Sequence, residues 1–137
     1  MLLKKRNDSP EKIHYKGVGN VLIKLKRHYI SCINLIENRS NGNLFRAASR
    51  FMKIEHSMID EIIRTFNIKE TNINSTHVIE EAPPVILNYN DMYTSNLNLI
   101  GFLKNTIKTF NNQHMSSFLS YWVAALQVEN DEIAKHL

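Results

Sequence analysis

Three glutamates on two predicted helices are the residues best placed to do chemistry in this sequence. Glu55 lies within "RFMKIEHSMIDEII" (Arg50 to Ile63), where helical spacing aligns it with an otherwise apolar stripe. Glu129 takes the equivalent place in the last predicted helix, and Glu132 follows it by three residues. Carboxylate oxygens bind hard cations, so Glu55, Glu129 and Glu132 form a candidate site for a metal ion that water completes.

Two other interpretations of Glu55 and Glu129 need no metal. In the first, the glutamates are buried and hydrogen-bonded, with Tyr29 or His28 as a partner, because an unpaired buried carboxylate is costly. In the second, the assumed stripe is rotated by one residue, which leaves both carboxylates at the rim of the bundle. We expect a structural polar pair and no cofactor, with Fe or Mn as the alternative.

Other reactive residues lack the neighbours that catalysis requires. Cys32 has only His28 at helical spacing and lies in an apolar stripe, where a thiol is normally inert. The histidines lack the close spacing of a multi-histidine metal site, so we expect them at the surface or rim. "GVG" (Gly17 to Gly19) follows no predicted strand and is not a phosphate-binding loop. The sequence indicates no small-molecule substrate and favours a protein without enzymatic activity.

Four predicted helices position these residues, over about 17–37, 44–67, 94–110 and 116–136. "NRSNGN" (Asn38 to Asn43) is a short turn that makes the second helix antiparallel to the first. Thr94 or Ser95 is expected to cap the third helix, and the fourth is expected to begin near Ser116 or Ser117. The predicted buried stripes of the four helices are, in order, Val18, Leu22, Leu25, Tyr29, Cys32 and Ile36; Leu44, Ala48, Phe51, Glu55, Met58 and Ile62; Asn96, Ile100, Leu103, Ile107 and Phe110; and Phe118, Trp122, Ala125, Glu129, Ile133 and His136.

A long polar segment separates the two halves. Within Ile68 to Tyr93, Pro83 and Pro84 exclude a continuous helix. A connection of this length is explained if it travels the length of a bundle, with Val85 to Leu87 packing across the helices. The predicted fold is an all-α four-helix bundle of two antiparallel hairpins, up-down-down-up, with a long crossover between helices two and three.

The two hairpins also resemble each other, because Glu55 and Glu129 each stand eleven residues after the first stripe residue of their helix. This topology resembles the ferritin-like (rubrerythrin) superfamily over residues 17–137. The resemblance implies one glutamate from the first helix of each hairpin and a Glu-x-x-His pair from the second, which together hold two iron or manganese ions. Met58 and Glu132 stand at the two histidine positions, and the middle of each first helix lacks a carboxylate. The resemblance therefore implies a degenerate dimetal site.

Composition sets the remaining limits. The chain has 137 residues, 43% of them hydrophobic and 22% charged, which suits one domain over residues 17–137. Four Gly and three Pro are few for an all-β protein. The single Cys allows no internal disulfide, so a cytoplasmic location is expected. No apolar stretch approaches the roughly 20 residues of a membrane span, and the order of charge and apolar residues after Met1 is not that of a signal peptide.

The positive charge is concentrated at the start of the chain. Residues 1–27 hold eight Lys and Arg against two acidic residues, a balance of 8 − 2 = +6. Residues 1–16 are predicted to be a basic arm, and Lys4, Lys5 and Arg6 would make its contacts with nucleic acid or an anionic membrane. The alternative is a solvated N-terminus without a partner.

Three hypotheses for function follow. The first is a non-enzymatic bundle, related to ferritin-like proteins, that acts through protein contacts as a homodimer. The second is a ferritin-like metal-binding or oxidoreductase protein with a reduced carboxylate site. The third is an adaptor that binds an anionic surface through its basic arm.

Overall fold

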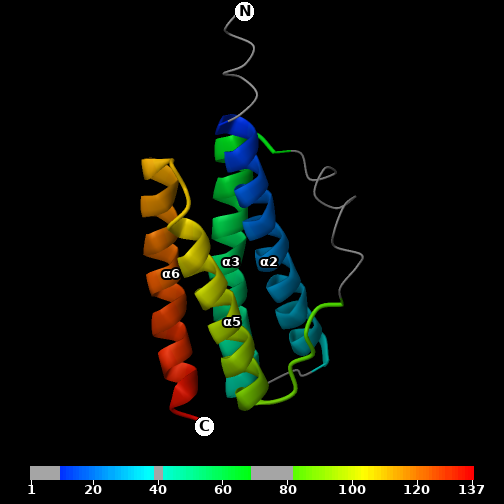
Figure 1. The fold of residues 1–137 in the computed structure, drawn as a ribbon. Coiled ribbons are helices and arrows are strands. Elements are labelled where there is room, and N and C mark those ends of the chain that lie inside the picture. The colour runs from blue at the N-terminus through cyan, green and yellow to red at the C-terminus, as the bar shows by residue number, and fades with distance from the viewer. Residues whose placement is uncertain (1–9, 39–41, 69–81) are drawn as a thin grey trace, which may run out of the picture.

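The computed structural model describes residues 10–38, 42–68 and 82–137, with only the backbone given for residues 10–16. These residues form four helices: α2 (Pro10–Asn38), α3 (Asn43–Phe66), α5 (Tyr89–Ile107) and α6 (Gln113–Ala134). The predicted all-α four-helix bundle is confirmed (Figure 1). None of the helices, over the part of the chain described, is both long and apolar enough to cross a membrane.

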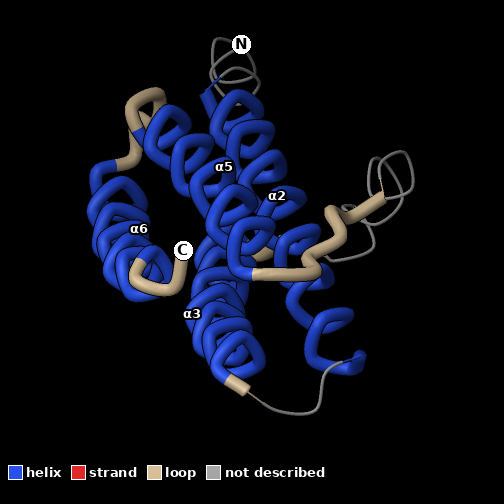
Figure 2. The backbone as a smooth tube through the Cα atoms, turned by 90° about the horizontal axis from the view of Figure 1, so that it is seen from below, coloured by secondary structure: helices blue, strands red, loops and turns tan. Residues whose placement is uncertain are grey.

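The four helices form two hairpins that pack against each other. Figure 1 shows α2 and α6 running downward and α3 and α5 running upward. The hairpin contacts join α2 to α3 and α5 to α6, and further contacts join α3 to α6 and α2 to α5. Seen from below, the helices surround a common interior in the order α6, α5, α2, α3 (Figure 2). The end of α3 and the start of α5 lie at opposite ends of the bundle (Figure 1).

The last part of the predicted crossover lies against α2, whereas residues 69–81 are outside the described part of the chain. The Arg27 guanidinium donates to the Ala82 carbonyl at 2.8 Å, and the Ser31 hydroxyl donates to the Pro84 carbonyl at 2.6 Å. Ile86 is buried in the core. Its neighbours Val85 and Leu87 are exposed, so the prediction that Val85 to Leu87 pack across the helices is correct only for Ile86.

Helix α3 is the element that the sequence pattern predicts best. It begins and ends one residue earlier than predicted, and all six predicted stripe residues are buried. The helix ends because Asn67 adopts the left-handed conformation, with φ 53° and ψ 47°, and its amide closes the last turn. Asparagine tolerates this conformation better than other non-glycine residues.

Helix α2 begins at Pro10, seven residues before the predicted start at Gly17. Proline is well tolerated in a first helical turn because its missing amide hydrogen would have no partner there. Gly17 lies inside the helix, where a Cβ would stand 3.1 Å from the Phe110 ring. This glycine therefore permits close packing and does not mark the helix end. Tyr29 and Ile36 are only partly buried, because the buried face centres on Leu25, His28, Cys32 and Leu35.

Helix α5 begins at Tyr89, several residues before the predicted caps Thr94 and Ser95. The Asn88 side chain accepts a hydrogen bond from the Asp91 amide at 2.8 Å, and the Asp91 carboxylate accepts one from the Leu87 amide at 3.0 Å. These two bonds between side chains and backbone amides start the helix earlier than the apolar pattern suggested.

The Asn88→Ala variant tests this cap. We expect the free energy of unfolding to fall by about 1 kcal/mol, because the Asp91 amide loses its acceptor. Urea unfolding measures the change, and Asn90→Ala, an exposed position within the same turn, is the matched control. Equal effects of the two substitutions would argue against a capping role for Asn88.

Helix α6 is rotated relative to the prediction. It begins at Gln113, where the Asn112 side chain accepts from the Met115 amide at 2.9 Å, and not near Ser116. Its buried residues are Met115, Leu119, Val123, Leu126, Asn130 and Ile133. The predicted stripe through Phe118, Trp122, Ala125 and Glu129 was wrong by about one residue, which is about 100° of helix rotation. The large aromatic residues lie at the edge of the core, partly buried, and the smaller Leu and Val side chains fill it.

Candidate metal centre

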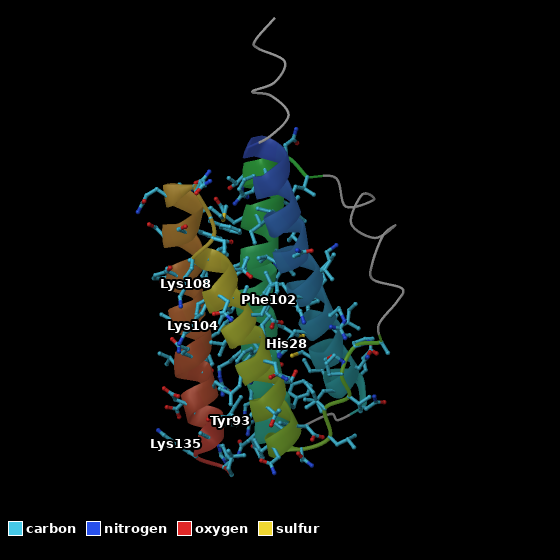
Figure 3. All side chains as sticks on the ribbon, viewed as in Figure 1. His28, Tyr93, Phe102, Lys104, Lys108 and Lys135 are labelled. Atoms are coloured by element: carbon cyan, nitrogen blue, oxygen red, sulfur yellow. The ribbon has the colours of Figure 1, made fainter. Side chains whose placement is uncertain are left out.

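A line of buried polar side chains crosses the interior of the bundle, with one member from each helix. His28 belongs to α2, Glu55 to α3, Asn96 to α5 and Asn130 to α6, and each is at most 4% exposed. Figure 3 labels His28 on α2, where that helix lies beside α5. Polar groups at this depth must find partners within the protein, so the contacts among these four residues define the site.

Hydrogen bonds fix the orientation of the His28 ring. The Asn96 amide nitrogen donates to Asn130 Oδ1 at 2.8 Å, so the Asn96 oxygen faces His28. His28 Nε2 lies 2.7 Å from that oxygen and therefore donates its hydrogen to it. In a neutral imidazole only one nitrogen carries hydrogen, which leaves the lone pair on Nδ1.

The other ring nitrogen faces a buried carboxylate. His28 Nδ1 lies 2.5 Å from Glu55 Oε2, and Glu55 is fully buried. The contact has the distance of an ion pair but not the angles of a hydrogen bond, so within the described residues neither Glu55 oxygen has a hydrogen-bond partner. Of the two metal-free interpretations, the buried one holds for Glu55, with His28 and not Tyr29 as its neighbour, but the expected hydrogen bond is not found among the described residues.

The two groups shift each other's protonation. Burial raises the pKa of Glu55, and the His28 charge and contact only partly oppose that rise. Burial lowers the pKa of His28, but the Glu55 charge and the contacts to Cys32 and Glu55 outweigh it and raise the pKa well above its ordinary value. Both side chains therefore bind a proton more tightly here than they would in water.

Cys32 completes this group. Its Sγ lies 3.7 Å from His28 Nδ1, one helical turn further along α2, and the side chain is fully buried. Burial raises the pKa of the Cys32 thiol, and the nearby His28 opposes that rise. One donor atom from each of His28, Cys32 and Glu55 lies within 4.8 Å of the other two.

Sequence reasoning missed this three-residue group, although its signal was present. His28 and Cys32 are four residues apart and so share one face of α2. Because α2 and α3 form an antiparallel hairpin, that face meets the stripe that carries Glu55. The two observations together would have pointed to a mixed histidine, cysteine and glutamate site.

The two other predicted ligands lie elsewhere. Glu129 is part-exposed at the rim, where Arg50 Nε lies 2.6 Å from its Oε1. Glu132 is 55% exposed and pairs with Lys135 at 3.1 Å. The structure therefore does not bring Glu129 and Glu132 to Glu55. The buried counterpart of Glu55 in α6 is Asn130.

Imidazole nitrogen, thiolate sulfur and carboxylate oxygen are the donors that Zn²⁺ and other borderline transition metals take. The same residues do not fit a pair of metal ions. The ferritin-like pattern requires several carboxylates, whereas Asn96 and Asn130 are neutral amides that already bond to each other and to His28. The site is suited to a single ion.

The remaining histidines and the basic arm stand apart from this centre. His56, His114 and His136 are exposed, as expected, whereas the same expectation was wrong for the buried His28. His136 stacks on Tyr89 with ring centroids 4.5 Å apart. Lys4, Lys5 and Arg6 lie outside the described residues, so their predicted contact with nucleic acid or an anionic membrane stays a prediction.

Comparison with known proteins adds no assignment to this geometry. The chain matches none of the protein-family models, curated proteins or solved structures with which it was compared.

Proposed function

We propose that this protein is a non-enzymatic metal-binding bundle that holds one divalent transition-metal ion at His28, Cys32 and Glu55. The observation that carries the proposal is the close approach of His28 Nδ1 to Glu55 Oε2, at 2.5 Å. Because Asn96 takes the hydrogen on Nε2, the other ring nitrogen, Nδ1, is the one free to bind a cation, and it lies between Glu55 Oε2 and Cys32 Sγ, 3.7 Å away. Two such groups need a cation between them. A proton fits at 2.5 Å, and a metal ion with bonds of about 2.0–2.2 Å would bind after the two side chains move apart by roughly 1 Å.

The surroundings favour a transition metal over a hard ion. Cys32 adds a soft sulfur donor, which suits Zn²⁺ or Fe²⁺ better than Mn²⁺. Asn96 orients the ligating imidazole, as hydrogen-bond acceptors behind metal-bound histidines generally do. A bound ion would link α2 to α3, so its binding energy would add to the stability of the hairpin.

The depth of the site supports a structural role for the ion. His28, Cys32 and Glu55 are each at most 4% exposed. The cavity that reaches His28 between α2 and α5 measures about 130 Å³ and is lined partly by Lys24 and Arg27. Ligand pockets usually measure about 300 Å³ or more, so this cavity is small for an organic substrate.

A ferritin-like origin is part of the same proposal. Its support is the order of helix directions and the one polar residue that each helix contributes to the centre. Glu55 and Asn130 hold corresponding buried places, and Met58 and Ile133 follow them at the spacing where the ferritin-like pattern has histidine. The chain would thus be a bundle of that type whose two-metal set has been replaced by a single mixed site.

Cobalt titration tests the proposal. Chelator-treated, reduced protein is titrated with Co²⁺ and then with Zn²⁺, and the thiolate-to-cobalt absorption is followed. We expect stoichiometric binding, displacement of Co²⁺ by Zn²⁺, and a rise in unfolding free energy of about 2.7 kcal/mol when free Zn²⁺ is about 100 times the Kd. Cys32→Ser should remove the thiolate absorption, and Glu55→Gln should weaken binding.

The rim glutamates supply matched controls. Glu129→Gln and Glu132→Gln remove carboxylates that pair with Arg50 and Lys135, so both variants should bind Co²⁺ like the unsubstituted protein. If Glu129→Gln and Glu132→Gln lose Co²⁺ binding as completely as Cys32→Ser does, the metal site includes these rim glutamates, as the sequence predicted. Absence of any thiolate–cobalt absorption in the unsubstituted protein would refute the proposal.

A further inference from the structure

A groove runs along the outer side of the α5–α6 hairpin and contains none of the three proposed metal ligands, although the buried Asn130 is in its lining. It consists of two hollows of about 480 and 520 Å³ that share Gly101, Lys104, Ala124 and Gln127 in their linings. The shared residues make the hollows one continuous groove. A Cβ added to Gly101 would meet nothing within 4 Å, so the middle of the groove has free space above the α5 backbone.

The walls of this groove expose apolar side chains. Leu97 is 47% exposed and Val128 is 61% exposed, and both line the lower hollow. Tyr121 is 70% exposed and shares the outward face of α6 with Ala124 and Val128, at helical spacings of three and four residues. A patch of this kind, with small residues at its centre, allows another helix surface to approach closely.

Charge is unequally distributed along the groove. Lys108 lines only the upper hollow, and Asp131 lines only the lower one. Figure 3 shows Lys108 at the upper end of α5, Lys104 below it and Tyr93 lower still. The groove therefore has a basic upper end and an acidic residue at its lower end.

We propose that this groove packs against the same groove of a second copy of the chain, with the two hairpins antiparallel. Lys108 is seven residues beyond Gly101 (108 − 101), and Asp131 is seven residues beyond Ala124 (131 − 124). At a rise of about 1.5 Å per residue, each lies about 10 Å from the groove midpoint, in opposite directions. A two-fold axis through the midpoint brings Lys108 of one copy level with Asp131 of the other.

Two further considerations favour this arrangement. A parallel arrangement would set the Lys104 and Lys108 side chains of one copy beside those of the other, and like charges in an interface are unfavourable. The hairpin face is about 30 Å long and about 20 Å wide, or about 600 Å², which approaches the roughly 800 Å² per partner of a specific interface. The inference does not depend on metal binding.

Molecular mass in solution tests the proposal directly. The chelator-treated full chain is measured by light scattering and sedimentation over a range of concentrations. We expect the unsubstituted chain to be a dimer. Val128→Glu should raise the dimer Kd at least about tenfold and so favour the monomer, because two-fold symmetry places two buried charges in each interface. Val85→Glu is the matched control, since Val85 is 74% exposed but lies in the segment against α2.

A charge exchange distinguishes this pairing from general apolar association. Lys108→Glu alone and Asp131→Lys alone should each weaken the dimer, and the double substitution should restore it. Thermal unfolding of each variant checks that the bundle remains folded, which is expected because these side chains are exposed. A chain that stays monomeric at every concentration, a Val128→Glu variant that dimerises normally, or a double variant weaker than both single variants would overturn the proposal.

Discussion

Replacement of His28 by leucine is expected to lower the free energy of unfolding by about 3–5 kcal/mol in chelator-treated protein at neutral pH. The cause is the Glu55 carboxylate, which is fully buried and which, among the described residues, has only the His28 nitrogen, 2.5 Å away, at ion-pair distance. Removal of one partner of a buried ion pair leaves the other charge without compensation. Urea unfolding monitored by circular dichroism measures the change.

The effect should be strongly asymmetric between the two partners. Glu55→Met leaves a neutral His28 whose Nε2 still donates to Asn96, so stability should be unchanged or higher. Addition of Glu55→Met to His28→Leu should recover most of the lost stability, apart from the cost of the unpaired Asn96 oxygen. A double variant as unstable as His28→Leu alone would show that lost packing, and not the buried charge, causes the destabilisation.

Stability of the chelator-treated protein is expected to fall as pH rises from mildly acidic to alkaline values. The pKa of His28 is raised by the Glu55 charge despite the opposing effect of burial, and burial raises the pKa of Glu55. Both groups therefore hold protons more tightly in the folded chain than in the unfolded chain. Their contribution is complete below the unfolded values, about 4.3 for Glu and about 6.5 for His, and is lost as pH rises through each folded value.

The size of this effect has a definite upper limit. Each group changes the free energy of unfolding by at most about 1.4 kcal/mol per pH unit within its window. Urea unfolding at several pH values in chelator measures the slope, and the His28→Leu, Glu55→Met double variant is the control. Cys32, Lys24 and Arg27, which lie near His28 in the described part of the chain, remain in the control. An equal slope in both proteins would assign the pH dependence to other groups.

The fold could be predicted largely because apolar spacing is a local property. The six stripe residues of α3 are all buried, and the short turn before it correctly implied an antiparallel hairpin. Helix starts were less predictable, since the Asn88 cap and the Pro10 start depend on single side chains and not on periodicity. The rotation of α6 was missed because Phe118 and Trp122 fit a core stripe as well as Leu119 and Val123 do.

The candidate site could be predicted only in part, for a physical reason. Glu55 was identified because it is the one charged residue in the predicted stripe of α3, and His28 was named as one of two partners. Cys32 appeared inert when α2 was considered alone, because its role depends on a side chain from α3. Asn96 and Asn130 carry no charge and became significant only through the hydrogen bonds that connect them across the bundle.

The Asn96–Asn130 contact also has a consequence for helix alignment. Glu129 and Asp131 flank Asn130, so a slip of α6 by one residue would move a carboxylate toward the interior that already holds Glu55. Apolar packing distinguishes such slips poorly, because Leu, Val and Ile side chains substitute readily for one another. A buried amide between two acidic neighbours therefore helps to specify the register of α6. A misaligned α6 would bury a carboxylate, whereas a uniformly apolar core would tolerate the shift.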